Sequence, residues 1–474
     1  MPINSFLYPG ASGPPAPYEV ANSLRFDDGS SDYMHITRGS AGNQKTFTIS
    51  MWLKRSRIAG GSGDAVYFWT VGPDGNTNFV LVFDNDDQLE IWEYKSSAYQ
   101  FRLKPSMRFR DPSAWYHLVV AFDTTQGTAS NRVKVYVNGT QLTNFDTSSY
   151  PSQNYDTLMN DDRKYWLGKY TSLSYYYDGY ICEMVVIDGQ QLDPTSFGEF
   201  DSDSPNIWKP IDVSGLTFGT NGFYLDFEDS SALGNDANGG DDFTVVNLTS
   251  VDQSTDTCTN NFATWNNLLG IQIPDSFSEG NLKLTMSQNA WRTTFSTIAS
   301  NSGKWYAEVK WVTGTEFTAG FGNAQSYSVD QDLNDLVANP GGDGFVSIIY
   351  KNGVLYENGS SSGSGYSTYS SGNIIMLAMD LDNYKLYLGV NGTWGNSANP
   401  ATNTNGVAIP SANQGDFFHF AVSTYGTTQA SANFGSPPYS ITSGNSDANN
   451  YGNFEYAVPS GYYALNTKNL AEFG

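Results

Sequence analysis

The residues of this sequence that could do acid, base or metal chemistry are spread along the chain. His35, His117 and His419 lie far apart. The sequence contains no HExxH, CxxC, GxSxG or Walker motif, the patterns that mark metallopeptidases, redox pairs, serine hydrolases and NTPases. His117 falls inside the alternating run WYHLVV, where a structural role is expected. These residues predict no catalytic centre.

Paired carboxylates are the remaining catalytic arrangement to consider, because glycosidases use two such groups about 5–9 Å apart. On a strand, two side chains face the same side only when they lie two or four residues apart. Glu90 and Glu93 are on opposite faces by this rule, Glu183 has no acidic residue at 185 or 187, and Glu308 has no partner. We therefore predict that the chain is not an enzyme, and glycan cleavage stays as an alternative function.

Acidic loops offer a different chemistry, the binding of a hard cation by oxygen atoms. The segment DFEDSSALGNDANGGDD is rich in carboxylates and amides, and Asp84, Asp86 and Asp87 form an acidic hairpin tip. No cofactor is required, but Ca²⁺ could bind, and otherwise these loops are solvated turns. The residues expected to hold Ca²⁺ are Asp226, Asp229, Asp236 and Asp241.

Aromatic side chains offer a third chemistry, the recognition of sugars or proteins by rings with a polar tip. Aromatic residues make up 15% of the chain, and four tyrosines crowd the short segment 170–177, where they cannot all face one core. Binding residues cluster on loops that a rigid scaffold positions. The predicted ligand-binding residues are Trp92, Tyr99, Tyr170, Tyr175, Tyr176 and Tyr177.

Length and charge limit the class of protein. A chain of 474 residues exceeds the roughly 250–300 residues of a single core, so two domains are expected. The 24 Lys and Arg against 48 Asp and Glu give a net charge of −24, which would repel nucleic acid. No stretch approaches the roughly 18 apolar residues of a membrane span, so no membrane insertion is expected.

The start of the chain and its cysteines limit the compartment. The segment MPINSFLYPGASGPPAPYEV has neither a basic start nor an apolar run, so no secretory signal peptide is expected. Residues 1–22 are rich in Pro and Gly and are predicted to form a docking arm. The two cysteines, Cys182 and Cys258, make no disulfide framework, and whether they pair stays open.

The spacing of apolar residues predicts an all-β protein with two tandem antiparallel β-sandwiches. Residues 23–227 contain alternating strands, including 47–53, 115–122 and 178–187, and Asn138-Gly139 marks a hairpin. Only 193–200 reads as a short helical turn, capped by Asp193. Residues 228–270 are predicted as a linker with one packed strand, and 271–474 as a second sandwich made of strands.

Several strand motifs resemble known families. The order FTISMWLKR, WYHLVVAFD, RVKVYVNGTQL and DGYICEMVVIDGQQLDPTSF resembles the laminin G or concanavalin A-like jelly roll. The segments GKWYAEV, GFG, LGVNGTW and ANFG, in that order from Gly303 to Gly435, are similar to the SPRY domain. The tract Gly359–Gly372 departs from that pattern, and it and Asn323–Asp343 are the long loops that SPRY domains use for partners.

This combination of domains is similar to virion proteins of tailed bacteriophages. The resemblance implies a place in the virion, extracellular after lysis, as a tail fibre or adhesin that recognises a host surface glycan or protein. A structural capsid-decoration or tail component is the alternative. A homotrimer is expected, since several copies multiply weak glycan binding. The arm is expected to dock on other virion proteins through Ile3, Phe6, Leu7 and Tyr8.

Overall fold

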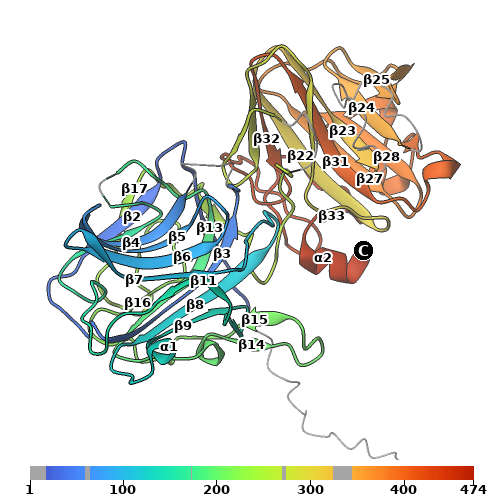
Figure 1. Cartoon of the computed structure of the whole chain (residues 1–474). Coiled ribbons are helices and arrows are strands. Elements are labelled where there is room, and N and C mark those ends of the chain that lie inside the picture. The colour runs from blue at the N-terminus through green and yellow to red at the C-terminus, as the bar shows by residue number, and fades with distance from the viewer. Residues whose placement is uncertain (1–17, 59–64, 172, 269–273, 324–343) are drawn as a thin grey trace, which may run out of the picture.

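The computed structural model of the chain shows two β-sandwiches joined end to end (Figure 1). The structure describes residues 18–58, 65–171, 173–268, 274–323 and 344–474. Within these residues, no helix is both long and apolar enough to cross a lipid bilayer. The predicted fold class, all-β with two antiparallel sandwiches, is confirmed.

The first sandwich consists of two eight-stranded antiparallel sheets and a small two-stranded one. The first sheet, sheet A, has the order β10-β9-β8-β3-β13-β1-β18, with β16 beside β13. Its strands are β1 (Ser23–Phe26), β3 (Thr46–Arg55), β8 (Trp115–Asp123), β9 (Val133–Val137), β10 (Thr140–Gln141), β13 (Gly179–Asp188), β16 (Phe223–Leu225) and β18 (Gln253–Ser254). The predicted strands 47–53, 115–122 and 178–187 therefore form the middle of this sheet.

The opposing sheet, sheet B, has the order β11-β7-β6-β5-β4-β12-β2-β17. Its strands are β2 (Tyr33–Thr37), β4 (Val66–Asp74), β5 (Thr77–Phe83), β6 (Leu89–Lys95), β7 (Ala98–Pro105), β11 (Phe145–Ser149), β12 (Lys164–Leu167) and β17 (Thr244–Val246). One large apolar core, with Trp69 and Tyr165 fully buried, fills the space between sheets A and B. Short elements complete this sandwich: α1 (Ala129–Arg132), η1 (Pro194–Ser196), β14 (Gly198–Phe200) and β15 (Trp208–Pro210).

The second sandwich pairs a nine-stranded sheet with a six-stranded one. The larger sheet contains β19 (Ser276–Ser278), β20 (Lys283–Met286), β32 (Thr428–Asn433), β22 (Lys304–Thr313), β27 (Ile374–Asp380), β28 (Lys385–Val390), β29 (Thr393–Trp394), β30 (Val407–Ala408) and β33 (Tyr463–Ala464). The smaller sheet contains β21 (Arg292–Phe295), β31 (Phe418–Tyr425), β23 (Glu316–Asn323), β24 (Val346–Tyr350), β25 (Val354–Glu357) and β26 (Ser360–Gly363). Trp265, Trp305 and Phe420 are among the side chains of its core.

The second sandwich also ends in a helix that the sequence pattern did not predict. Helix α2 (Thr467–Phe473) follows Asn466, whose side chain accepts a hydrogen bond from the amide of Asn469. Asparagine is a favoured N-cap, and Gly474 follows the last turn, so the usual start and stop signals were present. Short 3₁₀ turns occur at η3 (Gly395–Ser397), η4 (Pro400–Thr402) and η5 (Ser411–Asn413).

The segment predicted as a linker adds strands to the first sandwich. Within 228–270, β17 pairs with β2 in sheet B, and β18 pairs with β1 in sheet A. Tyr18, near the end of the predicted arm, packs on the first sandwich, where its hydroxyl donates to Glu183 of β13 (3.1 Å). The predicted docking residues Ile3, Phe6, Leu7 and Tyr8 lie outside the described residues. Cys182 and Cys258 are free thiols with Sγ atoms 3.8 Å apart.

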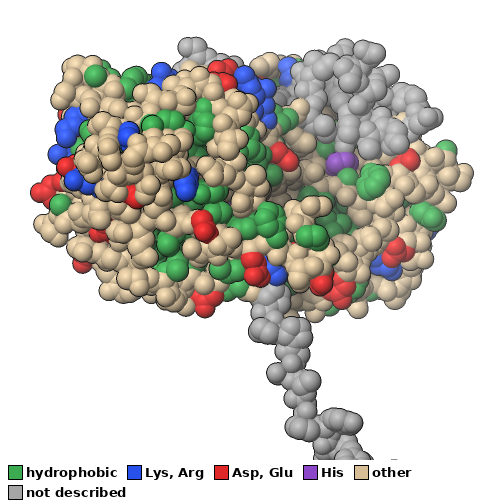
Figure 2. Space-filling model, turned by 60° about the horizontal axis from the view of Figure 1, so that its bottom comes forward, with side chains coloured by type: hydrophobic (Ala, Val, Ile, Leu, Met, Phe, Trp, Pro, Cys, Tyr) green, Lys and Arg blue, Asp and Glu red, His purple; other side chains and the backbone are tan. Residues whose placement is uncertain are grey.

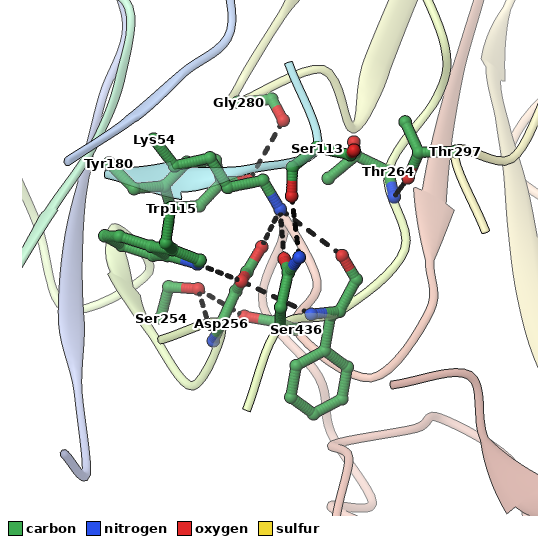
Figure 3. A network of polar contacts seen from close by, with 12 residues as sticks. Lys54, Ser113, Trp115, Tyr180, Ser254, Asp256, Thr264, Gly280, Thr297 and Ser436 are labelled. Atoms are coloured by element: carbon green, nitrogen blue, oxygen red, sulfur yellow. Dashed lines mark hydrogen bonds and ion pairs between the residues drawn. The ribbon is translucent and has the colours of Figure 1, made fainter. Parts of the chain in front are cut away.

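A buried polar network joins the two sandwiches (Figure 3). Lys54 of β3 binds Asp256 of the connecting segment, with 2.8 Å between Nζ and Oδ2. The hydroxyl of Tyr180 donates to the carbonyl of Gly280 (3.0 Å), and the hydroxyls of Ser254 and Ser436 lie 2.7 Å apart. The junction is therefore specified by hydrogen bonds between residues distant in sequence.

His117 is a structural residue of sheet A. Its ring stacks on Trp52, with 4.7 Å between ring centroids, and accepts a hydrogen bond from the indole of Trp208 (2.8 Å to Nδ1). Nε2 lies 2.9 Å from the hydroxyl of Ser50. Burial lowers the pKa of His117 to about 3, so the ring is neutral near pH 7.

The predicted hairpin turn at Asn138-Gly139 presses against the same Trp208. Both turn residues have positive φ, 47° and 75°, as a type I′ turn requires. A Cβ atom at Gly139 would lie 2.4 Å from Cε3 of Trp208. Replacing Gly139 with alanine is therefore expected to lower the free energy of unfolding by about 1–2 kcal/mol, measured by urea denaturation. The control Gly127→Ala has open space around its Cβ and should change stability by less than about 0.5 kcal/mol.

Candidate functional site

The two outer faces of the first sandwich differ in how they are covered. The outer face of sheet A packs against Phe197, Val213 and Phe218 from the segment that follows β13. Residues 18–20 and Cys258 cover another part of it. The outer face of sheet B carries a second apolar cluster, in which Val80, Val82, Trp92 and Tyr170 are buried, with the exposed rings of Tyr99 and Tyr175 beside it. Among the described residues, the outer face of sheet B therefore combines buried rings with exposed ones.

Strand alternation places the rings of sheet B on one side. In β5, Val80 and Val82 point outward, and their register partners in β6 are Trp92 and Glu90. Tyr67 in β4 pairs with Val82, so its ring joins the same side. We call this surface the outer aromatic face; its rings belong to Tyr67, Trp92, Tyr94, Tyr99, Tyr170 and Tyr175.

The rings of the outer aromatic face contact one another in a row. The centroids of Tyr67 and Tyr170 are 4.3 Å apart, those of Trp92 and Tyr170 are 6.3 Å apart, and those of Trp92 and Tyr99 are 5.6 Å apart. Trp92 and Tyr170 are 7% and 8% exposed, whereas Tyr99 and Tyr175 are 49% and 46% exposed. Two buried rings thus form the base of the row, and two exposed rings project from it.

Hydrogen bonds fix the loop that carries Tyr170 and Tyr175. The amide of Tyr170 donates to the carbonyl of Tyr175 (2.9 Å), and the amide of Asn78 donates to the hydroxyl of Tyr170 (3.3 Å). Burial raises the pKa of Tyr170 and of Tyr67, so both phenols keep their protons at neutral pH. These hydrogen bonds hold Tyr170 and its loop in a fixed position on the outer aromatic face.

A second group of rings continues the same face across β12 and β2. Trp166 pairs with Thr70, which is itself paired with the outward Val80, so Trp166 also faces outward. Nζ of Lys164 lies 3.9 Å from the ring centroid of Trp166, and Nζ of Lys169 lies 4.4 Å from that of Tyr33. These positions are typical of cation–π contacts. We call this group the basic aromatic cluster; it comprises Tyr33, His35, Trp166, Tyr176, Lys164 and Lys169.

The basic aromatic cluster keeps its histidine neutral. Burial lowers the pKa of His35, and the charges of Lys164 and Lys169 lower it further. The two lysines therefore supply the positive charge of this part of sheet B. On the face of the molecule in Figure 2, acidic and basic side chains are interspersed among polar ones, with hydrophobic side chains in small groups.

The structure separates the four tyrosines of segment 170–177. Tyr170 and Tyr175 lie on the outer aromatic face, and Tyr176 lies beside Tyr33 in the basic aromatic cluster. The prediction of Tyr177 as a ligand-binding residue is wrong, because its ring is fully buried between the sheets. Its hydroxyl donates to the carbonyl of Lys54 (3.0 Å), which satisfies the polar tip inside the core.

The carboxylates considered for catalysis are held by other groups. Glu93 faces the core, where it accepts hydrogen bonds from the Tyr155 hydroxyl (2.6 Å) and the Leu158 amide (2.8 Å). Glu90 faces outward and forms an ion pair with Arg102. Glu183 accepts from the hydroxyl of Tyr224 (2.8 Å). Glu308 accepts from four groups, the Tyr306 hydroxyl, the Asn433 amide and two backbone amides.

The predicted Ca²⁺ ligands do not come together. The carboxylate of Asp229 is tied to its own turn, accepting from the amide and hydroxyl of Ser231 (2.8 and 2.6 Å). Asp226 accepts from the amide of Glu228, and Asp236 from that of Tyr224. Among the described residues, the group of acidic side chains close enough to share a metal ion lies elsewhere, and it includes none of Asp226, Asp229, Asp236 or Asp241. The structure therefore does not bring these four predicted residues together as one set of metal ligands.

The acidic hairpin tip is also neutralised by cations. Asp84 pairs with Lys104, and Asp86 lies 3.8 Å from Arg108. Asp87 is buried and pairs with Arg55 (3.1 Å) and Arg110 (2.8 Å). These carboxylates stabilise the sandwich instead of offering free ligands.

The comparisons with known proteins agree with the geometry of the first sandwich. Residues 28–193 match the family model described as the Concanavalin A-like lectin/glucanases superfamily. The predicted concanavalin A-like and laminin G resemblance of this sandwich is thereby confirmed. No curated protein matches the sequence.

Several solved structures show similarity to this chain at low sequence identity. Domains LG4-5 of the mouse laminin alpha1 chain share 10% identity over 88% of this chain and 90% of theirs, with a TM-score of 0.31. Domain 4 of an extracellular arabinanase from Geobacillus stearothermophilus, in complex with arabinotriose, has 19% sequence identity. The match covers 34% of this chain and 68% of that one, with a TM-score of 0.26. The SPRY domain of human HERC1 has 13% sequence identity. The match covers 32% of this chain and 87% of that one, with a TM-score of 0.25.

Several residues of this face escaped the sequence reasoning although a signal was present. Tyr33 and His35 alternate in YMHIT, and Tyr94 lies two residues after the predicted Trp92 in LEIWEYK, which predicts a shared face in each strand. Tyr67 was harder to place, because the register shifts between Tyr67 and Trp69 and breaks the alternation of β4. In the second sandwich, residues 324–343 of the predicted partner loop lie outside the described residues. The tract 359–372 contains β26 and the buried Tyr369.

Proposed function

We propose that this chain is a non-catalytic glycan-binding protein and that the outer aromatic face of the first sandwich holds the ligand. Sugars present apolar C–H faces and polar hydroxyls together. Tyr and Trp rings match both features, since the ring is apolar and its tip is polar. The concanavalin A-like fold of the first sandwich is compatible with glycan binding.

The observation that carries this proposal is the row of rings on the outer side of sheet B, which ends in the exposed Tyr99 and Tyr175. Large exposed aromatic groups are unusual on a protein surface without a partner, and they mark interaction sites. Here Tyr99 and Tyr175 project from a base formed by Trp92 and Tyr170. The guanidinium of Arg102 lies 5.0 Å from the centroid of Tyr99, adding a hydrogen-bond donor beside an exposed ring.

The arrangement of carboxylates supports binding over cleavage. A glycosidase needs two carboxyl groups on either side of one bond. On sheet B, Glu90 is paired with Arg102 and Glu93 points into the core, so the two do not face a common ligand.

Removing the exposed rings tests this proposal. Tyr99→Ala and Tyr175→Ala are each expected to weaken binding to a glycan by about tenfold, and the double variant by more. The measurement is binding of the full chain to a panel of immobilised neutral and acidic polysaccharides, followed by titration with those that are retained. Both side chains are about half exposed, so the variants should fold as the wild type does.

The matched control is Tyr384→Ala, which removes a 38% exposed tyrosine from the second sandwich. It should leave glycan affinity unchanged. Wild-type chain that binds no polysaccharide in the panel, or Tyr99 and Tyr175 variants that bind as tightly as the wild type, would contradict the proposal.

The finer role that we propose is that of a tail fibre or adhesin in the virion of a tailed bacteriophage. The similarity of domain order noted in the sequence supports it, and a structural capsid-decoration or tail component remains the alternative. Electron microscopy of assembled particles labelled with an antibody to this chain separates the two. Label at the distal tail supports the adhesin role, and label over the capsid lattice supports decoration.

A further inference from the structure

Three carboxylates meet at the edge of the first sandwich that faces the second. Phe26, the last residue of β1, is the register partner of Gly179, the first residue of β13. This pairing brings Asp27 and Asp28, which follow β1, beside Asp178, which precedes β13. Each of the three offers an oxygen atom within 4.8 Å of the others.

One of these carboxylates is buried without a partner for one oxygen. Asp178 is 4% exposed, and its Oδ1 accepts no hydrogen bond. Asp32, whose Oδ2 accepts from the amide of Asp27 (3.0 Å), also has a buried Oδ1 without a donor. A buried carboxylate oxygen without a partner is costly, because the lost hydration is not replaced.

A cavity of about 330 Å³ gives access to this cluster from the junction. Asp28 and Asp178 line it from the first sandwich, and Asn267 and Asn281 line it from the second. The Nδ2 atom of Asn267 donates to the carbonyl of Ser56 (2.8 Å), but its Oδ1 is buried and accepts no hydrogen bond. Asn267 and Asp178 thus line the same cavity, and each has one buried side-chain oxygen without a hydrogen-bond donor.

The charge at this place is not balanced by the cation that contacts it. Arg57 forms an ion pair with Asp28, with 2.8 Å between Nη1 and Oδ2, and both side chains are about one-third exposed. Lys283 adds a second positive charge near Asp27, so two cations face three carboxylates here. A divalent cation has the charge that would complete the cluster.

We propose that Asp27, Asp28 and Asp178 hold a Ca²⁺ ion at the junction, with the Asn267 side-chain oxygen as a ligand from the second sandwich. Carboxylate and amide oxygens are the ligands that Ca²⁺ prefers, and it accepts irregular sets of six to eight oxygens. Mg²⁺ demands near-octahedral geometry and keeps its waters, which suits a mostly buried, irregular cluster less well. This site is separate from the outer aromatic face and does not depend on the proposed function.

Calcium titration of the full chain tests this site. After treatment with a chelator, the wild type is expected to bind about one Ca²⁺ per chain in calorimetry. Saturating CaCl₂ should raise its Tm by about 4 °C or more, because an ion that binds only the folded state stabilises it. Asp178→Asn is nearly isosteric and should abolish both the heat and the rise in Tm. The matched control Asp229→Asn changes an exposed aspartate of the same sandwich and should keep both.

Three results would overturn the site. These are the absence of heat with the wild type, an Asp178→Asn variant that keeps the heat, and equal heat and Tm rise with MgCl₂ at the same concentration. If Asp178→Asn does not fold, Asp28→Asn serves instead, because Asp28 is one-third exposed. Circular dichroism checks its fold, and the Ca²⁺ heat should then fall at least tenfold; unchanged heat would also overturn the proposal.

Discussion

Replacing Asp256 with alanine is expected to lower the free energy of unfolding by about 3–5 kcal/mol, because it leaves the ammonium group of Lys54 buried without its counterion. The side chains of Lys54 and Asp256 are 1% and 2% exposed. Asp256 also accepts hydrogen bonds from the indole of Trp115 (3.1 Å) and the amide of Phe262 (3.3 Å). The variant therefore removes the acceptor for three donors at the junction in Figure 3.

Urea denaturation of the full chain measures this loss. The double variant Lys54→Met/Asp256→Leu removes both charges and is expected to recover part of the stability, since no charge is left unpaired while the Trp115 indole and the Phe262 amide still lack their acceptor. The control is Lys45→Ala, which breaks an exposed pair with Asp156 (3.5 Å) and should change stability by less than about 1 kcal/mol. An Asp256→Ala variant no less stable than Lys45→Ala would show that the junction pair does not stabilise the fold.

The sequence predicted the strands better than it predicted their contacts. The run FTISMWL became β3 because its apolar residues alternate, and Asn138-Gly139 formed its turn because both residues tolerate positive φ. Lys54 directly follows this run, where a solvated side chain is expected at the end of a strand. It is instead buried against Asp256, 202 residues away. No local pattern signals such a pairing, because it depends on how two sandwiches pack.

Backbone irregularities explain other gaps in the sequence reasoning. Glu183 has a φ of 50°, and the register of β13 against β3 shifts between Cys182 and Val185. Such bulges change which face a side chain occupies, so simple alternation fails there. Helix α2 was missed for a different reason, because its seven residues are short against the many strands around it.

For the candidate sites too, residues close together in the sequence were easier to predict than residues that only the fold brings together. Trp92 and Tyr99 were predicted as ligand-binding residues, but the hairpin of β6 and β7 that brings their rings together was not predicted. The acidic loop of Asp226 and Asp229 was conspicuous in sequence, but each carboxylate is used by its own turn. Asp178 stands alone in the sequence, and only the pairing of β1 with β13 brings it to Asp27 and Asp28.

Buried acids should make the stability of this protein fall as pH rises through the weakly acidic range. Burial raises the pKa of Glu93 to about 7 in the folded state, against an ordinary value of 4.5. Between these values the folded chain holds a proton that the unfolded chain releases, so Glu93 stabilises the fold most below pH 4.5 and loses that contribution by pH 7. Each pKa unit corresponds to about 1.36 kcal/mol, so the loss is about 3 kcal/mol.

The contribution of His117 to stability has the opposite pH dependence. Burial lowers its pKa to about 3, so its stabilisation of the fold is lost as pH falls below 6.5. The two effects partly cancel in the wild type, so a variant is needed to isolate Glu93. Glu93→Gln cannot titrate, and its destabilisation relative to the wild type should be about 2–3 kcal/mol smaller at pH 8 than at pH 4.5. Urea denaturation at both pH values measures the difference.

The control for this experiment is Asp229→Asn. Hydrogen bonds from Ser231 lower the pKa of Asp229 below its ordinary 3.8, so its titration lies beneath the tested range. Its effect on stability should therefore be the same at pH 4.5 and pH 8. A Glu93→Gln effect that is equally constant would mean that Glu93 is ionised in the folded protein throughout this range, with the hydrogen bonds from Tyr155 and Leu158 outweighing its burial.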